Sequence, residues 1–79
     1  MKPSVVLYTR PGCHLCDDAK LILQQHGLSP QIMNIDQDPD LAERYRDCIP
    51  VVSIDGRERF RGRVDPILLR RILDSKQAD

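Results

Sequence analysis

The sequence lacks an excess of either charge, because 12 lysines and arginines balance 12 aspartates and glutamates. Nucleic-acid-binding domains are usually basic, so we expect no nucleic-acid partner. The sequence also lacks an apolar run near the roughly 20 residues of a membrane span. The apolar stretch after Lys2 is too short for a secretory signal and has no small-residue cleavage pattern. We therefore expect a cytoplasmic protein with no membrane partner.

Cysteine is scarce as well, with three residues in 79. Secreted domains held together by disulfides usually carry an even number of cysteines at spread spacings. Here Cys13 and Cys16 form a CxxC motif and Cys48 stands alone, a pattern that favours redox or metal chemistry in a reducing compartment. A chain of this length without internal repeats is expected to form a single domain over residues 1–79.

The CxxC motif lies between a strand-like and a helix-like segment. The apolar run 5–8 is followed by Arg10-Pro11-Gly12, which breaks the strand, and a helical pattern begins after this turn. Two cysteines three residues apart at a helix start can close a small disulfide ring. The positive end of the helix stabilises a thiolate, which is the nucleophilic form. This context indicates thiol–disulfide chemistry, with Cys13 partly exposed and Cys16 more buried.

Metal binding is the alternative for this motif. A zinc site needs four ligands, and only Cys48, His14 and His26 are available to join the two motif cysteines. His26 lies three helical turns after Cys16, so the spacing favours redox chemistry. His14 would stabilise a thiolate if protonated, but the helix dipole disfavours a cation there, which favours a solvent-exposed role. A lone cysteine such as Cys48 is more often a small buried hydrophobe, although its position before Pro50 leaves a redox role as an alternative.

Periodicity and turn residues predict the element order β-α-β-α-β-β-α. Aspartate followed by proline, at Asp38-Pro39 and Asp65-Pro66, is typical of a helix start. Gly27 is expected to end the first helix, and Asp55-Gly56 to join two strands in a hairpin. The strands are expected at 4–9, 31–36, 51–54 and 57–61, and the helices from 13 or 14 to 26, from 38 to about 47 and from 65 to about 75, followed by a frayed tail at 76–79.

These elements predict an α/β fold. The first two strands are joined through a helix and should be parallel, whereas the last two form an antiparallel hairpin. The result is a four-stranded mixed sheet with helices on both faces. On the first helix, helical spacing places five residues on one face: Leu15, Ala19, Ile22, Leu23 and His26.

Arginine is concentrated in the C-terminal part of the chain. Alternation along the strand 57–61 places Arg57, Arg59 and Arg61 on one face and Glu58 and Phe60 on the other. Arginines on an exposed edge strand hinder its pairing with another chain. We favour this explanation over a basic patch that steers an anionic partner.

The motif residues resemble those of a known family. The sequence is similar to glutaredoxins of the thioredoxin-like fold in the run Tyr8-Thr9-Arg10-Pro11-Gly12-Cys13-His14-Leu15-Cys16 and in Ile49-Pro50-Val51-Val52 at a strand start. More narrowly, the pattern G-C-x-L-C resembles a group of small glutaredoxin-like proteins. The element order agrees with this fold over essentially the whole chain.

The resemblance implies roles for the matching residues. Cys13 would be the nucleophile and Cys16 the resolving thiol. Pro50 would be the cis-proline of the fold, facing the Cys13 sulfur, and Val51 would offer its backbone to a substrate peptide or to glutathione. Arg10 would lie near the glutathione carboxylate, and Asp65 would match the first acid of the family's Gly-Gly-x-Asp-Asp segment. The implied substrate-binding residues are Arg10, His14, Ile49, Pro50, Val51 and Asp65.

Two positions depart from the related families in ways that bear on chemistry. Arg63 replaces the second glycine of the Gly-Gly-x-Asp-Asp segment, where the backbone would approach glutathione. Leu7 stands where thioredoxins carry a buried aspartate, so a proton acceptor is missing at that place.

Together these observations predict a dithiol–disulfide oxidoreductase that acts in cell redox homeostasis. The Cys13 thiolate attacks a protein disulfide or a glutathione mixed disulfide, and Cys16 then releases the reduced substrate. We expect a monomer with no tightly bound cofactor, with glutathione as a candidate co-substrate and with glutathione or a reductase as electron donor. The alternatives are a non-catalytic module that binds a peptide at Val51 and a metal or iron–sulfur carrier that uses Cys13.

Overall fold

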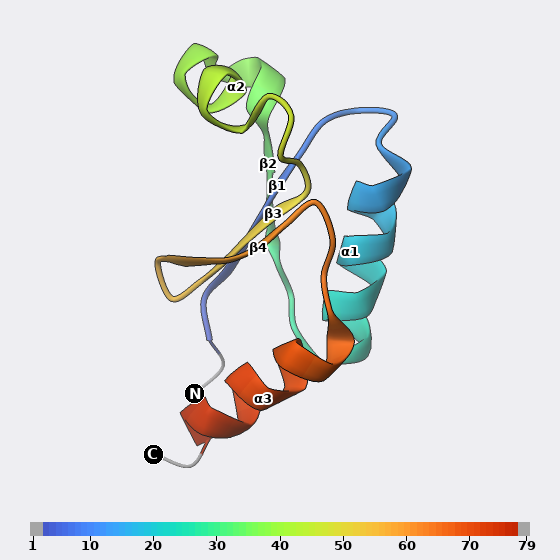
Figure 1. Cartoon of the computed structure of the whole chain (residues 1–79), viewed down its shortest axis with the longest axis vertical. Coiled ribbons are helices and arrows are strands. Elements are labelled where there is room, and N and C mark those ends of the chain that lie inside the picture. The colour runs from blue at the N-terminus through green and yellow to red at the C-terminus, as the bar shows by residue number, and fades with distance from the viewer. Residues whose placement is uncertain (1–2, 78–79) are drawn as a thin grey trace.

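The computed structural model describes residues 3–77 (Figure 1). The elements in this part of the chain are β1 (Val5–Thr9), α1 (His14–Gln25), β2 (Gln31–Asn34), the 3-10 helix η1 (Ile35–Gln37), α2 (Pro39–Tyr45), β3 (Val51–Ile54), β4 (Arg57–Arg61) and α3 (Pro66–Gln77). The strands form one sheet in the order β2-β1-β3-β4. β1 and β2 are parallel, and the other pairs are antiparallel. The predicted α/β fold with a mixed sheet is confirmed.

The two faces of the sheet carry different helices. Leu7 of β1 belongs to a large apolar cluster that includes Leu23 of α1 and Leu69 of α3. Its neighbour Tyr8 packs on a smaller cluster that contains Tyr45 of α2 and Val51 of β3. Successive residues of a strand point to opposite faces, so α1 and α3 cover one face and α2 covers the other. Figure 1 shows α2 well separated from α1 and α3.

The second strand is shorter than predicted. β2 ends at Asn34 rather than at Asp36, because the chain turns into η1. The Asn34 side chain starts this turn, since its Oδ1 accepts a hydrogen bond from the Asp36 N–H at 2.9 Å. Such local side-chain hydrogen bonds compete with strand pairing.

Both Asp-Pro helix starts are confirmed. Asp38 Oδ1 accepts the Asp40 N–H at 2.9 Å at the start of α2. The helix ends differ from the prediction: α2 stops at Tyr45 instead of near residue 47, and α3 runs to Gln77 instead of residue 75. Residues 78–79 of the predicted frayed tail lie outside the described residues.

The buried face of α1 contains the predicted Ala19 and Leu23, with Ile22 packed against the same cluster, but it does not contain Leu15. Cys16, Ala19 and Leu23 are buried, whereas Leu15 is 48% exposed. The prediction expected Cys16 to be more buried than Cys13 but did not place it on the apolar face of the helix. Its apolar thiol in fact begins the buried stripe, with the spacing that one helix face requires.

Strand β4 is irregular, and this overturns the predicted arginine face. Ser53 of β3 pairs with Glu58 rather than with Arg59, which marks a shift in register. Arg59 is the extra residue in β4, and it reverses the alternation of side chains along the strand. Glu58 therefore shares a face with Arg61, and its Oε2 accepts from Arg61 Nε at 2.8 Å. The arginines remain exposed on an edge strand, as the protection argument requires.

Candidate active site

The turn after β1 places Cys13 at the N-terminus of α1. Gly12 has a φ of 79°, which glycine adopts without steric cost, and the chain reverses there. Cys13 is the N-cap residue of α1, with an extended backbone, and its Sγ accepts the Cys16 N–H at 3.2 Å. The sulfur thus takes the place of the oxygen that usually caps a helix, at the positive end of the helix dipole. The Cys13 side chain is only partly buried.

Cys16 lies one turn into α1, with only 4% of its surface exposed. Burial, followed by the hydrogen bond with Cys13, raises the pKa of the Cys16 thiol from 9.0 to about 12, against a lowering by a backbone hydrogen bond from Arg10. The expected difference in exposure between the two cysteines is therefore observed. Cys16 is held as a neutral thiol near neutral pH, because burial disfavours its charged form.

The proline before β3 has a cis peptide bond, between Ile49 and Pro50. Pro50 is buried and Ile49 is half-buried. The Pro50 carbonyl accepts the Gly62 N–H at 2.7 Å, which ties this segment to the loop after β4. The proposed substrate contact at Val51 needs a correction, because β3 has a neighbouring strand on each side. Val51 is fully buried and presents no free sheet edge.

Arg10 makes an ion pair that the sequence analysis did not anticipate. Its Nε donates to Asp36 Oδ1 at 3.0 Å. The two residues follow β1 and β2, and parallel neighbouring strands end at the same edge of a sheet. That rule was available from the sequence and would have paired them. Arg10 also lines a cavity of about 320 Å³ whose other lining residues include Cys16 and Lys20.

Asp65 and the two histidines lie at the ends of helices. Asp65 caps α3, because its Oδ1 accepts the N–H groups of Ile67 at 2.9 Å and Leu68 at 3.4 Å. His14 is exposed at the first position of α1. His26 caps the other end of α1, where Nδ1 lies 2.8 Å from the Ile22 carbonyl.

Cys48 belongs to the α2 side of the sheet. It is half-buried and packs with the cluster around Tyr45. Arg61 Nη1 lies 3.9 Å from its Sγ, a weak contact that involves sulfur. Cys48 is therefore less buried than the expected small hydrophobe, although it packs on an apolar cluster.

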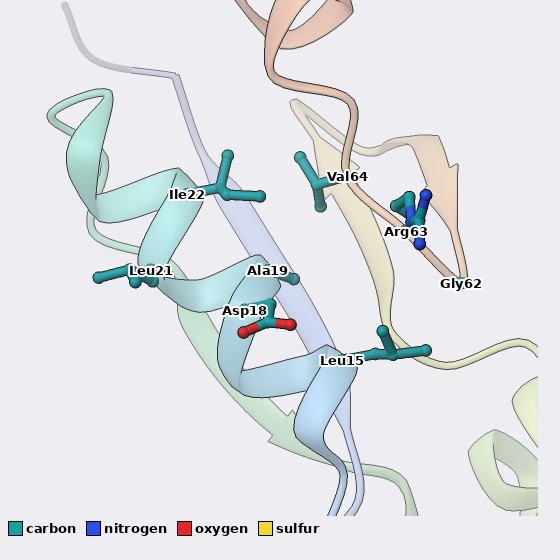
Figure 2. Close-up of a pocket in the computed structure, with 8 residues that line it drawn as sticks. All are labelled: Leu15, Asp18, Ala19, Leu21, Ile22, Gly62, Arg63 and Val64. Atoms are coloured by element: carbon teal, nitrogen blue, oxygen red, sulfur yellow. The ribbon is translucent and has the colours of Figure 1, made fainter.

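A second cavity begins within the CxxC motif itself (Figure 2). We call it the α1–loop groove, because it lies between α1 and the loop that joins β4 to α3, and its volume is about 360 Å³. Its lining residues are Leu15, Asp18, Ala19, Leu21, Ile22, Gly62, Arg63 and Val64. Leu15 was predicted to share one helix face with Ala19 and Ile22, and these two residues also line the groove.

Within residues 3–77, no helix is long and apolar enough to cross a membrane. In the same range, no group of three or more histidine, cysteine, aspartate and glutamate side chains is arranged to hold a metal ion.

Comparison with curated proteins finds related sequences. The glutaredoxin-like domain model (DUF836) matches residues 4–74. An uncharacterised protein of Mycobacterium tuberculosis is 36% identical over 80 residues, covering 87% of this chain and 80% of that protein. Glutaredoxin-C11 of Arabidopsis thaliana is 29% identical over 65 residues, covering 71% of this chain and 63% of the plant protein.

Comparison with solved structures finds the same fold. Protein XcR50 from X. campestris is 35% identical with a TM-score of 0.78, covering 91% of this chain and 97% of that structure. NrdH-redoxin of Escherichia coli, a glutaredoxin-like protein with a thioredoxin-like activity profile, is 26% identical with a TM-score of 0.69, covering 87% and 93%. Together with the family model, which spans residues 4–74, these matches establish that the chain belongs to the glutaredoxin-like domain family of the thioredoxin-like superfamily.

Proposed function

We propose that this protein is a thiol–disulfide oxidoreductase in which Cys13 is the nucleophile and Cys16 the resolving thiol. The observation that carries the proposal is the hydrogen bond from the Cys16 N–H to Cys13 Sγ, 3.2 Å long, at the N-cap of α1. This N–H and the helix dipole stabilise negative charge on the half-buried sulfur, and the thiolate is the attacking species.

The reaction transfers two electrons from the dithiol to the substrate disulfide. The Cys13 thiolate attacks one substrate sulfur and forms a mixed disulfide, and the other substrate sulfur leaves as a thiolate. Cys16, after losing its proton, attacks the Cys13 sulfur. The remaining substrate sulfur leaves as a thiolate and is protonated, and the protein holds a Cys13–Cys16 disulfide.

The resolving step requires that Cys16 lose its proton. Leu7, which stands where thioredoxins carry a buried aspartate, is fully buried in the apolar cluster. It cannot accept this proton. The hydrogen bond with Cys13 contributes to the raised pKa of Cys16, and this contribution disappears once Cys13 is bonded to the substrate. Mixed-disulfide formation therefore makes Cys16 easier to ionise. Cys16 also lines a cavity together with Arg10 and Lys20, and this cavity gives the proton a route to solvent.

A glutathione redox titration of the full chain, with acid quench and intact mass measurement, tests this proposal. We expect wild type and Cys48→Ser to form a reversible intramolecular disulfide. Cys16→Ser should accumulate a mixed disulfide with glutathione, and Cys13→Ser should form neither species through the motif. The potential of the wild-type disulfide then indicates the electron donor: a value near −200 to −230 mV is typical of glutaredoxins, and a lower one of thioredoxin.

Inert motif cysteines across the whole titration would contradict the proposal. In that case metal content of the freshly purified protein would be measured next, because a metal carrier would lose its metal in Cys13→Ser. Partner binding that survives Cys13→Ser, without any redox cycling, would instead support a non-catalytic binding module.

A further inference from the structure

The α1–loop groove presents apolar side chains to solvent next to the redox motif. Leu15 is 48% exposed and Leu21 is 54% exposed, and both line the groove. Figure 2 shows Leu15 and Ile22 pointing from α1 towards the opposite loop, which contributes Val64. Exposed apolar side chains that gather around a cavity are a feature of surfaces that bind ligands or other proteins.

The groove is continuous with the site of the proposed chemistry. Leu15 stands between Cys13 and Cys16 in the sequence, and it lines the groove from the first turn of α1. On the opposite wall, Gly62 donates its N–H to the carbonyl of Pro50 at 2.7 Å. Both walls are therefore anchored to segments of the active site. The groove therefore begins within two residues of Cys13 along the chain.

The length of the groove selects the kind of occupant. Leu15 and Ile22 are separated by seven residues of helix, a rise of about 10 Å. An extended polypeptide covers this distance with about three residues. Glutathione has a single residue on each side of its cysteine and is too short to fill the groove from Cys13. A segment of a protein substrate is long enough.

Charged side chains on the two walls indicate which residues the bound segment carries. Figure 2 shows Arg63 on the loop and Asp18 on α1, both exposed. The ion pairs found within residues 3–77 are Arg10–Asp36 and Arg61–Glu58, so Arg63 and Asp18 are not ion-paired in that part of the chain. An acidic side chain on the bound segment would pair with Arg63, which also stands close in sequence to the arginines of β4.

We infer that the α1–loop groove binds a segment of the protein whose disulfide Cys13 attacks. The segment places an apolar side chain between Leu15 and Val64 and an acidic side chain beside Arg63. This inference rests on the proposed function and adds to it a substrate class: protein disulfides with apolar and acidic residues next to the cysteine, in preference to glutathione disulfides.

Single-turnover kinetics with synthetic peptides test the inference without any electron donor. Each peptide carries one cysteine as a mixed disulfide with thionitrobenzoate, whose release is coloured. Cys13 attacks the peptide sulfur and thionitrobenzoate leaves; Cys16 then attacks Cys13 and the peptide thiol leaves. In one pair of peptides, leucine lies on one side of the cysteine and glutamate on the other. The two peptides of the pair have these residues in opposite orders. Matched peptides carry glycine for leucine or lysine for glutamate, and glutathionyl thionitrobenzoate is the small reference.

We expect the reduced wild-type protein to react about tenfold faster with the better leucine–glutamate peptide than with its glycine counterpart, because a leucine side chain is buried. Rates are divided by the rate with the glutathione reference, so that changes in cysteine reactivity cancel. Leu15→Ala should remove most of this tenfold preference. Arg63→Gln should lower the preference for glutamate over lysine by about three- to fivefold.

Two matched controls separate the groove from the rest of the surface. Ile67→Ala removes an exposed apolar side chain, 72% exposed, that does not line the groove. Arg57→Gln removes an exposed arginine of β4 outside it. Both should keep the wild-type preferences.

The outcomes distinguish the two proposals. No thionitrobenzoate release with any reagent would mean that the oxidoreductase proposal has failed. Release with all reagents but equal reference-corrected rates for all peptides would overturn the groove inference and leave the oxidoreductase proposal standing. A peptide preference that is unchanged in Leu15→Ala and Arg63→Gln would also overturn it, since recognition would then lie elsewhere.

Discussion

At the scale of single residues, Cys13 and Cys16 carry the same chemical group in different surroundings. Cys13 Sγ accepts a backbone N–H at a helix N-terminus and is partly exposed. Cys16 is packed beneath it, with 4% of its surface exposed. An attacking thiol needs access and a stabilised charge, whereas a resolving thiol needs only to reach its neighbour.

The buried Cys16 thiol should make the reduced protein less stable in alkaline solution. Its pKa is raised from 9.0 to about 12 in the folded state, so the unfolded state loses this proton at lower pH. The stabilising effect of the neutral Cys16 thiol is complete below pH 9 and is lost as the pH rises towards 12. We expect the free energy of unfolding in urea to fall by up to about 1.4 kcal/mol per pH unit in this range.

The control for this prediction is Cys16→Ala under the same reducing conditions. Other groups titrate in alkaline solution in both proteins, so the difference between the two slopes isolates Cys16. Equal slopes above pH 9, the start of the interval, would show that the folded protein does not hold the neutral thiol.

The Arg10–Asp36 ion pair should compete with substrate carboxylates. Both side chains are partly exposed and their contact is 3.0 Å long, so the pair stabilises the fold by at most about 1 kcal/mol. Asp36→Asn releases the guanidinium. If Arg10 contacts a glutathione carboxylate, KM for glutathione disulfide should fall about two- to fivefold. KM for the uncharged hydroxyethyl disulfide is the control, and an equal fall for both disulfides would argue against carboxylate binding.

At the scale of elements, helix α1 has one buried face and one exposed face with leucine on both. Leu23 is fully buried and Leu21 is 54% exposed. Leu23→Ala should destabilise the protein by about 2–5 kcal/mol through lost burial and a cavity. Leu21→Ala should change stability by less than about 0.5 kcal/mol. Urea denaturation of both variants checks this, and similar losses would mean that the helix is rotated from its described position.

The start of α3 depends on Asp65, whose Oδ1 accepts the Ile67 N–H at 2.9 Å. Asp65→Ala should lower the free energy of unfolding by about 1 kcal/mol, whereas Asp65→Asn should keep most of it, because asparagine caps as well as aspartate. The two variants also separate capping from binding. A loss of glutathione binding in the asparagine variant, without a loss of stability, would assign the carboxylate a role in the substrate site.

At the scale of the whole molecule, the sheet divides the core unequally. Among residues 3–77, the cluster under α1 and α3 contains ten buried residues, and the cluster under α2 contains three. Helix α2 is seven residues long, and Tyr45 is its buried residue. Elements with few buried apolar contacts open locally before the rest of a protein does.

Native-state hydrogen exchange should therefore reveal two levels of stability. We expect the backbone amides of α2 to exchange at least about tenfold faster than those of α1 and β3, a difference of about 1.4 kcal/mol. Equal protection in all three elements would indicate that the protein opens as one cooperative unit. Cys48 and Ile49 follow α2, so an opening of α2 would change the segment that leads to Pro50.

Much of the fold was predictable because its signals are local. The N-caps at Asp38 and Asp65 act on amides two residues away, and the CxxC motif carries its chemistry within one helical turn. Leu15 was misassigned to the apolar face of α1, because Cys16 occupies the start of the buried stripe instead. The boundary of β2 was misassigned because the Asn34 side chain diverts the chain into η1.

The sequence by itself determined the order of elements, the two helix caps and the CxxC motif, since each depends on residues close together in the chain. The tertiary structure alone decided the shift in β4, the burial of Val51 between two strands and the groove between Leu15 and Arg63. These features depend on register and on the meeting of segments far apart in sequence. Neither is encoded by local propensity, because both are set by how the apolar faces pack together.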